Sequence, residues 1–152
     1  LEAQMVISRE GGQRVVAAED FFIGPAIDIT RTTVMEAGEI LTAVRIPAKW
    51  ANAEFFYEKV ADRNVWDFAL VSLAAVMRTE GGNIQESRLV CGAVECTPRR
   101  LRSVEQAIQG QPRSQATADM VAGMASQGAQ PLTHNHFKMP LMDNLVQRAL
   151  TA

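Results

Sequence analysis

Residues 58–68 bring several side chains that could do chemistry into one short stretch of this sequence. They include two cations, Lys59 and Arg63, together with three acids and Trp66. A lysine at the end of a strand can hydrogen-bond a carbonyl group or offset negative charge on a cofactor. A tryptophan face can stack on a planar ring or a cation. Two interpretations follow: a ligand-binding loop held on rigid strands, or an ion-paired hairpin in which Trp66 covers the core.

Two other pairs of residues could serve as ligands or nucleophiles. His134 and His136 have the His-x-His spacing of a metal pair, but they lie between prolines without a nearby cysteine, which favours a solvated loop. Cys91 and Cys96 are too few for a structural zinc or iron–sulfur site of their own, so we expect two buried thiols in a reducing compartment. No other motif suggests a nucleophile or a phosphate-binding loop.

Composition and charge exclude some classes of function. The chain has 152 residues and is 47% hydrophobic, which suits one compact domain, or one domain with a short piece of another. Its net charge of -2 does not indicate nucleic-acid binding. The longest apolar stretch, interrupted by Ser72, is far shorter than the roughly 20 residues of a membrane helix. Because the chain starts at Leu1 without a signal-peptide pattern, we expect a piece of a longer protein.

The first 50 residues are expected to form a small β-rich piece without an evident core. Residues 3–16 predict a hairpin that turns at two glycines and has no partner sheet. Residues 19–38 are expected to be irregular, anchored by Phe21 and Phe22. Residues 39–46 alternate like a strand, which Pro47 ends.

Three strands are expected next, over residues 54–60, 69–78 and 84–95, in an antiparallel meander. The middle segment is nearly all apolar, as in a strand that is buried on both faces. In the third segment, simple alternation places Ile84 on the opposite side from Leu89 and Cys91.

The last third of the chain predicts three helices. The first begins at Pro98, with Arg99 and Arg100 where the helix dipole disfavours cations. Ser114 caps the second, and Pro140 starts the third. The apolar residues that should face inward are, in helix order, Leu101, Val104 and Ile108; Met120, Val121 and Met124; and Leu141, Leu145, Val146, Ala149 and Leu150. The predicted fold is therefore α+β, with a three-stranded antiparallel sheet and a three-helix bundle in residues 53–152.

Several short patterns, taken in order, resemble the FAD-binding subunit of molybdenum hydroxylases, the xanthine dehydrogenase and aldehyde oxidoreductase family. The resemblance rests on Phe21-Phe22-x-Gly24, Glu39-Ile40-Leu41-x-x-Val44-x-Ile46-Pro47, Phe56-x-x-Lys59, Arg63, Asp67-x-Ala69, Gly92-Ala93-Val94, Pro98-Arg99-Arg100, Asn135-x-x-Lys138-x-x-Leu141 and Leu145-Val146-x-Arg148-Ala149-Leu150. It covers essentially the whole chain. Residues 1–50 resemble the tail of the FAD-binding subdomain, and residues 53–152 resemble the domain that closes over the flavin.

The resemblance implies three flavin-binding positions. Leu41 matches a leucine that contacts the flavin ring, Lys59 a lysine near its pyrimidine edge, and Asp67 an acid that orders the neighbouring loop. Lys59 would favour negative charge on the reduced flavin. The resemblance also implies a complex with a molybdopterin subunit and a [2Fe–2S] subunit. The glycine-rich loops that bind the FAD diphosphate are absent from this sequence, so the chain alone should bind FAD poorly.

Two functions follow as expectations. The first is a part of an oxidoreductase that passes electrons from iron–sulfur clusters through FAD to an external acceptor during aldehyde or purine oxidation. The second is a non-catalytic module that docks partner subunits. We expect a cytoplasmic protein, or a periplasmic one if a partner subunit carries the complex across the membrane.

Overall fold

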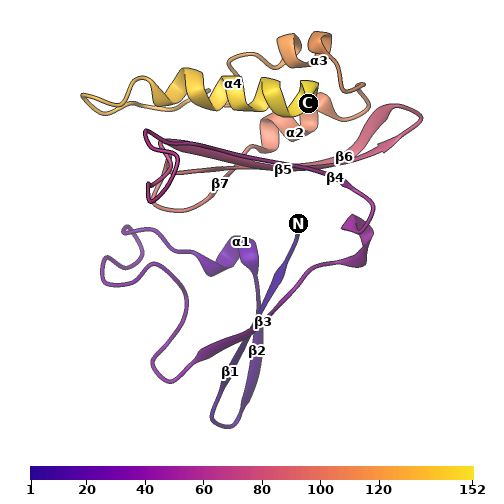
Figure 1. Ribbon diagram of the computed structural model, residues 1–152. Helices are drawn as coiled ribbons and strands as arrows, with labels where there is room; N and C mark the ends of the chain where they lie inside the picture. Colours follow the sequence, from indigo (N-terminus) through magenta and orange to yellow (C-terminus); the bar gives the residue numbers. More distant parts are fainter. The chain divides into compact units, whose positions relative to one another are not determined.

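The computed structural model describes residues 1–152, and they form two compact units, Leu1–Ala51 and Asn52–Ala152 (Figure 1). Each unit has its own antiparallel sheet. No helix is both long enough and apolar enough to cross a membrane.

The N-terminal unit is built on a three-stranded sheet in the order β2-β1-β3. Its elements are β1 (Gln4–Arg9), β2 (Gly12–Ala17), α1 (Ala18–Phe21), β3 (Ile40–Arg45) and the 3-10 turn η1 (Ala48–Trp50). The predicted hairpin and the strand before Pro47 are confirmed, and Gly11, with φ of 87°, makes the turn. The expectation that the hairpin lacks a partner was wrong, because β3 pairs with β1 along most of its length.

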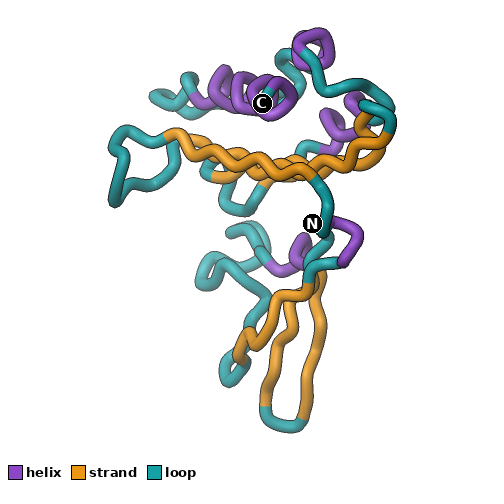
Figure 2. The backbone as a smooth tube through the Cα atoms, turned by 45° about the vertical axis from the view of Figure 1, so that its right-hand side comes forward, coloured by secondary structure: helices purple, strands orange, loops and turns teal.

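The C-terminal unit carries a four-stranded sheet with its helices on one face (Figures 1 and 2). The strands, in spatial order, are β4 (Glu54–Val60), β5 (Val71–Glu80), β6 (Asn83–Gly92) and β7 (Arg99–Arg100), and the helices are α2 (Arg102–Ile108), α3 (Gln115–Met120) and α4 (Lys138–Thr151). The α+β class, the three-stranded meander and the three helices are confirmed.

The short strand β7 corrects the predicted start of the first helix. Arg99 and Arg100 pair with Cys91 and Val90 of β6 instead of opening a helix at Pro98. The helix begins only at Arg102, after the Leu101 amide has donated to the Leu89 carbonyl. The expected conflict between Arg99, Arg100 and the helix dipole therefore does not arise.

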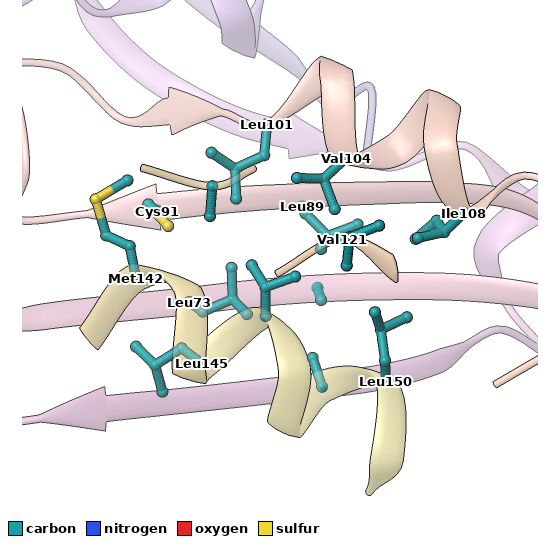
Figure 3. Close-up of a cluster of buried hydrophobic side chains, with 14 of the residues drawn as sticks. Leu73, Leu89, Cys91, Leu101, Val104, Ile108, Val121, Met142, Leu145 and Leu150 are labelled. Carbon is teal, nitrogen blue, oxygen red and sulfur yellow. The ribbon is translucent and has the colours of Figure 1, made fainter. Parts of the chain in front are cut away.

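The core of the C-terminal unit lies between the sheet and the helices (Figure 3). Its labelled members come from β5, β6, α2, α4 and the segments next to α2 and α3: Leu73, Leu89, Cys91, Leu101, Val104, Ile108, Val121, Met142, Leu145 and Leu150. The inward stripes predicted for the first and last helices are confirmed, apart from Leu141, which is only partly buried. In the second helix Val121 is buried, but Met120 is 49% exposed and was wrongly placed in the core.

A register shift in the β5–β6 pair explains another difference. Arg78 pairs with Glu86 and Thr79 with Ile84, so β6 holds one extra residue, Gln85. A bulge of this kind reverses the side on which the following residues point. Ile84 is therefore buried on the same face as Leu89, whereas simple alternation had placed the two on opposite sides.

The expectation that β5 is buried on both faces holds only in part. Val71, Leu73, Ala75 and Met77 point into the core, and Val76, on the opposite face, is also buried. Ala74, however, is exposed.

Candidate functional site

The loop between β4 and β5, residues 61–70, lies beyond the end of the sheet and is closed at its base by backbone bonds. Val60 pairs with Val71, and the Leu70 amide donates to the Val60 carbonyl at 2.7 Å. Because the loop leaves and re-enters the sheet at adjacent positions, the strands fix both of its ends. Figure 1 shows it as the magenta loop that joins β4 to β5.

Lys59 is tied to the far side of this loop. It is the next-to-last residue of β4, and its Nζ donates to the backbone carbonyl of Asp67 at 3.0 Å. An ammonium group has three N–H donors, and this is the only bond that the Lys59 side chain makes within the chain. Two donors therefore remain available to a ligand or to water.

The Asp67 carboxylate binds Arg63 at the tip of the loop. Oδ2 accepts from the Arg63 amide at 2.9 Å and lies 3.8 Å from the Arg63 Nε. The Arg63 guanidinium in turn donates to the Trp66 carbonyl at 2.7 Å. Lys59, Arg63, Trp66 and Asp67 are thus brought together by hydrogen bonds.

The apolar side chains of the loop face outward. Trp66 is 94% exposed, and its neighbours Val65 and Phe68 are also exposed. Trp66 has a φ of 55°, a left-handed conformation that a bulky residue rarely adopts. The interpretation in which Trp66 covers the core was therefore wrong, and the loop offers an aromatic face instead.

Leu41 belongs to the N-terminal unit. It lies on β3 opposite Ile7, with 38% of its surface exposed.

The residue before β3, Glu39, accepts two hydrogen bonds of 2.7 Å from the Arg14 guanidinium and one of 2.9 Å from the Glu36 amide. These bonds lower the pKa of Glu39 to about 2. The Arg14–Glu39 pair holds the start of β3 in place. It was not predicted from the sequence, because 25 residues separate its two members.

The remaining candidates from the sequence do not form a site. His134 and His136 lie in a loop, and no group of three or more histidine, cysteine, aspartate or glutamate residues could hold a metal ion. Both cysteines are free. Cys91 is buried, and its burial raises the thiol pKa to about 11. Cys96 is exposed, so the expectation of two buried thiols was wrong for this residue.

Residues 56–152 match the model of the CO dehydrogenase flavoprotein C-terminal domain. The chain is 31% identical to the glyceraldehyde dehydrogenase medium chain of Sulfolobus acidocaldarius, over 88% of this chain and 46% of that protein. It is 32% identical to the aldehyde oxidoreductase FAD-binding subunit PaoB of Escherichia coli, over 89% of this chain and 39% of that protein.

The fold agrees with solved structures of similar proteins. Carbon monoxide dehydrogenase from Hydrogenophaga pseudoflava superposes with a TM-score of 0.84 at 28% identity, over 99% of this chain and 52% of that chain. Quinoline 2-oxidoreductase from Pseudomonas putida superposes with a TM-score of 0.82 at 29% identity, over 99% of this chain and 51% of that chain. The chain spans about half the length of these relatives or less. With a match that runs from β4 to the end of the chain, it belongs to the CO dehydrogenase flavoprotein C-terminal domain family.

Proposed function

We propose that this chain is the C-terminal part of the FAD-binding subunit of a molybdenum hydroxylase, and that Lys59 and the 61–70 loop form one wall of its flavin pocket. The observation that carries the proposal is the bond between Lys59 and the Asp67 carbonyl, which ties a cation with two remaining donors to the loop residue that follows the exposed Trp66. The names of relatives such as the FAD-binding subunit of Escherichia coli support the choice of FAD.

The residues of the loop suit a planar ring with polar edges. Lys59 can donate to ring oxygen or nitrogen atoms and place positive charge beside them. Trp66 offers a face for stacking, and Asp67 fixes the carbonyl that positions Lys59. Leu41, which the family resemblance matches to a flavin-contacting leucine, is a separate proposed contact with the cofactor. FAD, when bound, carries electrons from iron–sulfur clusters to an external acceptor, and the protein positions the cofactor and tunes it.

Residues outside this chain would hold the rest of the cofactor. The sequence offers no glycine-rich loop before a helix to bind the diphosphate. The side chains of Ile40 and Val44 on β3, and of Ile46 just after it, are exposed, as on a sheet that continues into further protein. We therefore assign residues 1–50 to the tail of an FAD-binding subdomain and residues 53–152 to the domain that closes over the flavin.

The relatives are named as medium chains and subunits, which places them in enzymes of several chains. For this protein we propose a complex with a molybdopterin subunit and a [2Fe–2S] subunit that oxidises an aldehyde or a purine. A substrate screen on the purified complex tests this assignment. A complex that oxidises neither aldehydes nor purines would contradict it.

Substitution of Lys59 tests the flavin pocket most directly. In the full-length subunit within its complex, Lys59→Met should lower the flavin midpoint potential, because a nearby positive charge stabilises negative charge on the reduced ring. Lys138→Met is the matched control, since Lys138 also donates to a backbone carbonyl, that of Ala93, from outside the loop. An unchanged potential and flavin content in Lys59→Met would refute the assignment.

A protein-docking role is the second candidate, and the exposed group of Val65, Trp66 and Phe68 favours it. Trp66→Ala separates the two functions. Flavin binding predicts altered absorbance and altered reduction of the flavin, with the subunits still associated. Docking alone predicts an unchanged flavin spectrum and dissociation of the complex during gel filtration.

A further inference from the structure

A row of three residues crosses the C-terminal sheet at the end that carries the loop between β4 and β5. Lys59 of β4 lies opposite Ser72 of β5, and Ser72 lies opposite Gly92 of β6. Directly paired residues of antiparallel strands point to the same face, with Cβ atoms roughly 5 Å apart. The neighbours of Ser72 along β5, Val71 and Leu73, are buried in the core, so the row lies on the face opposite the helices.

The hydroxyl of Ser72 is available to a ligand. The residue is half-buried, and its Oγ makes no hydrogen bond within the protein. A serine hydroxyl can donate one hydrogen bond and accept others. Because Lys59 keeps two N–H donors on the neighbouring strand, the two side chains can bind different polar atoms of one molecule.

Gly92 leaves the space beside this hydroxyl open. A Cβ atom at position 92 would lie 2.6 Å from the Ser72 Oγ, closer than Cβ atoms approach other atoms in proteins. Unlike the turn glycines Gly11 and Gly81, Gly92 does not have a positive φ. The lack of a side chain at Gly92 therefore follows from the space that the hydroxyl needs, and not from the conformation of the backbone.

The same face of the sheet stays open next to the row. Two residues further along the strands, Tyr57 is paired with Ala74. Tyr57 is 69% exposed, and Ala74 is exposed as well. A small side chain beside an exposed aromatic ring leaves room for a planar molecule next to Lys59 and Ser72.

We propose that Ser72 is a further contact of the flavin ring, and that Gly92 keeps the Ser72 hydroxyl in place for it. The inference rests on the proposed flavin pocket, since Lys59 sets the position of the ring. Lys59 binds one polar atom of the ring, and the Ser72 hydroxyl hydrogen-bonds another.

Titration of the flavin-free, full-length subunit in its complex tests the contact. The two probes are FAD and ADP, which lacks the flavin ring. Ser72→Ala should weaken FAD binding roughly three- to tenfold, as expected for one lost hydrogen bond, and should leave ADP binding unchanged. Ser87→Ala is the matched control, because it also removes an unpartnered hydroxyl from this sheet, but opposite the core residue Met77. It should leave the binding of both probes unchanged.

Gly92→Ala tests the role of the glycine. In the parent, the added methyl group displaces the Ser72 hydroxyl and should weaken FAD binding about as much as Ser72→Ala does. In the Ser72→Ala background its nearest neighbour is the Cβ atom at 4.0 Å, so the same change should have little further effect. Equal and additive losses in the two backgrounds would contradict the role given to Gly92.

The contact itself is refuted if Ser72→Ala binds FAD as tightly as the parent, or loses FAD and ADP affinity alike. Lys59→Met separates this failure from that of the flavin pocket. A changed flavin in Lys59→Met beside an unaltered Ser72→Ala refutes Ser72 alone, and no change in either variant refutes the pocket as well. A higher KM for the external acceptor at unchanged FAD affinity would also overturn the inference, because Ser72 would then bind the acceptor.

Discussion

Lys59 and Asp67 are joined across the 61–70 loop by a bond from the lysine Nζ to the aspartate's backbone carbonyl. The bond leaves the Asp67 carboxylate free to accept from the Arg63 amide, so one residue holds the loop at two points. The two positions that the family resemblance singles out in this region therefore have different roles. Lys59 carries the charge, and Asp67 determines where that charge lies.

Removal of the Asp67 carboxylate should loosen the tip of the loop. Asp67→Ala takes away the acceptor of the Arg63 amide, a loss comparable with that of a helix cap, about 1 kcal/mol. Hydrogen exchange at the Arg63 amide should quicken by roughly fivefold. Asp67→Asn keeps one side-chain carbonyl oxygen, so its rate of exchange at the Arg63 amide should lie between those of the parent and Asp67→Ala. Asp62→Ala serves as the control on the same loop, and equal exchange in all variants would contradict the role given to Asp67.

The sequence predicted what depends on local patterns. Alternation, apolar and aromatic runs and turn glycines located β1 to β6, and the apolar stripe of α4 located its buried face, including Leu145 and Leu150. These features follow from periodicity, which neighbours along the chain determine. Lys59 and Asp67 were singled out by the family resemblance, and the bond between them shows that they lie together.

These local patterns could not predict pairing between residues that are distant in the sequence. β7 exists because β6 has a free edge, and nothing within Arg99–Arg100 alone distinguishes a strand from a helix start. The bulge at Gln85 reverses the side of Ile84 without any glycine to mark it. Glu105 was not among the residues expected in the core, yet it is buried, and its carboxylate accepts from the Leu89 amide and from Arg100.

The two tryptophans should respond very differently to truncation. Trp50 is 1% exposed, so Trp50→Ala should destabilise the protein by about 3–5 kcal/mol. Trp66 is 94% exposed, and Trp66→Ala should change stability by no more than about 0.5 kcal/mol. Chemical unfolding of the full-length subunit without bound flavin measures both. A large loss in Trp66→Ala would show that its ring is buried in the assembled protein.

Glu105 should matter more for stability than an exposed glutamate. Glu105→Ala leaves the Leu89 amide without its acceptor and removes the carboxylate that binds Arg100, which should cost about 2–4 kcal/mol. Glu58→Ala is the control, because its pair with the exposed Arg148 should contribute less than about 1 kcal/mol. Similar unfolding midpoints for the two variants would contradict this ranking.

The two cysteines should differ in reactivity. Burial raises the pKa of the Cys91 thiol to about 11, so at neutral pH it is protonated and shielded. Cys96 is exposed and should alkylate in the native protein. Peptide mapping after iodoacetamide treatment should find the label at Cys96 before unfolding and at both residues after it. Native labelling of Cys91 would contradict its place in the core.

The Arg14–Glu39 pair should make the N-terminal unit sensitive to acid. The pKa of Glu39 is about 2 in the folded protein and 4.5 ordinarily, so the folded state favours the carboxylate. Its contribution is fully present above pH 4.5 and is lost as the pH falls toward 2. The stability difference between the parent and Glu39→Gln should therefore narrow across this interval in pH-dependent unfolding. Glu36→Gln is the control, because its carboxylate is 62% exposed and lies 3.8 Å from Arg9. A constant difference between the parent and Glu39→Gln from pH 6 to pH 2 would show that the Arg14 pair does not hold Glu39 ionised.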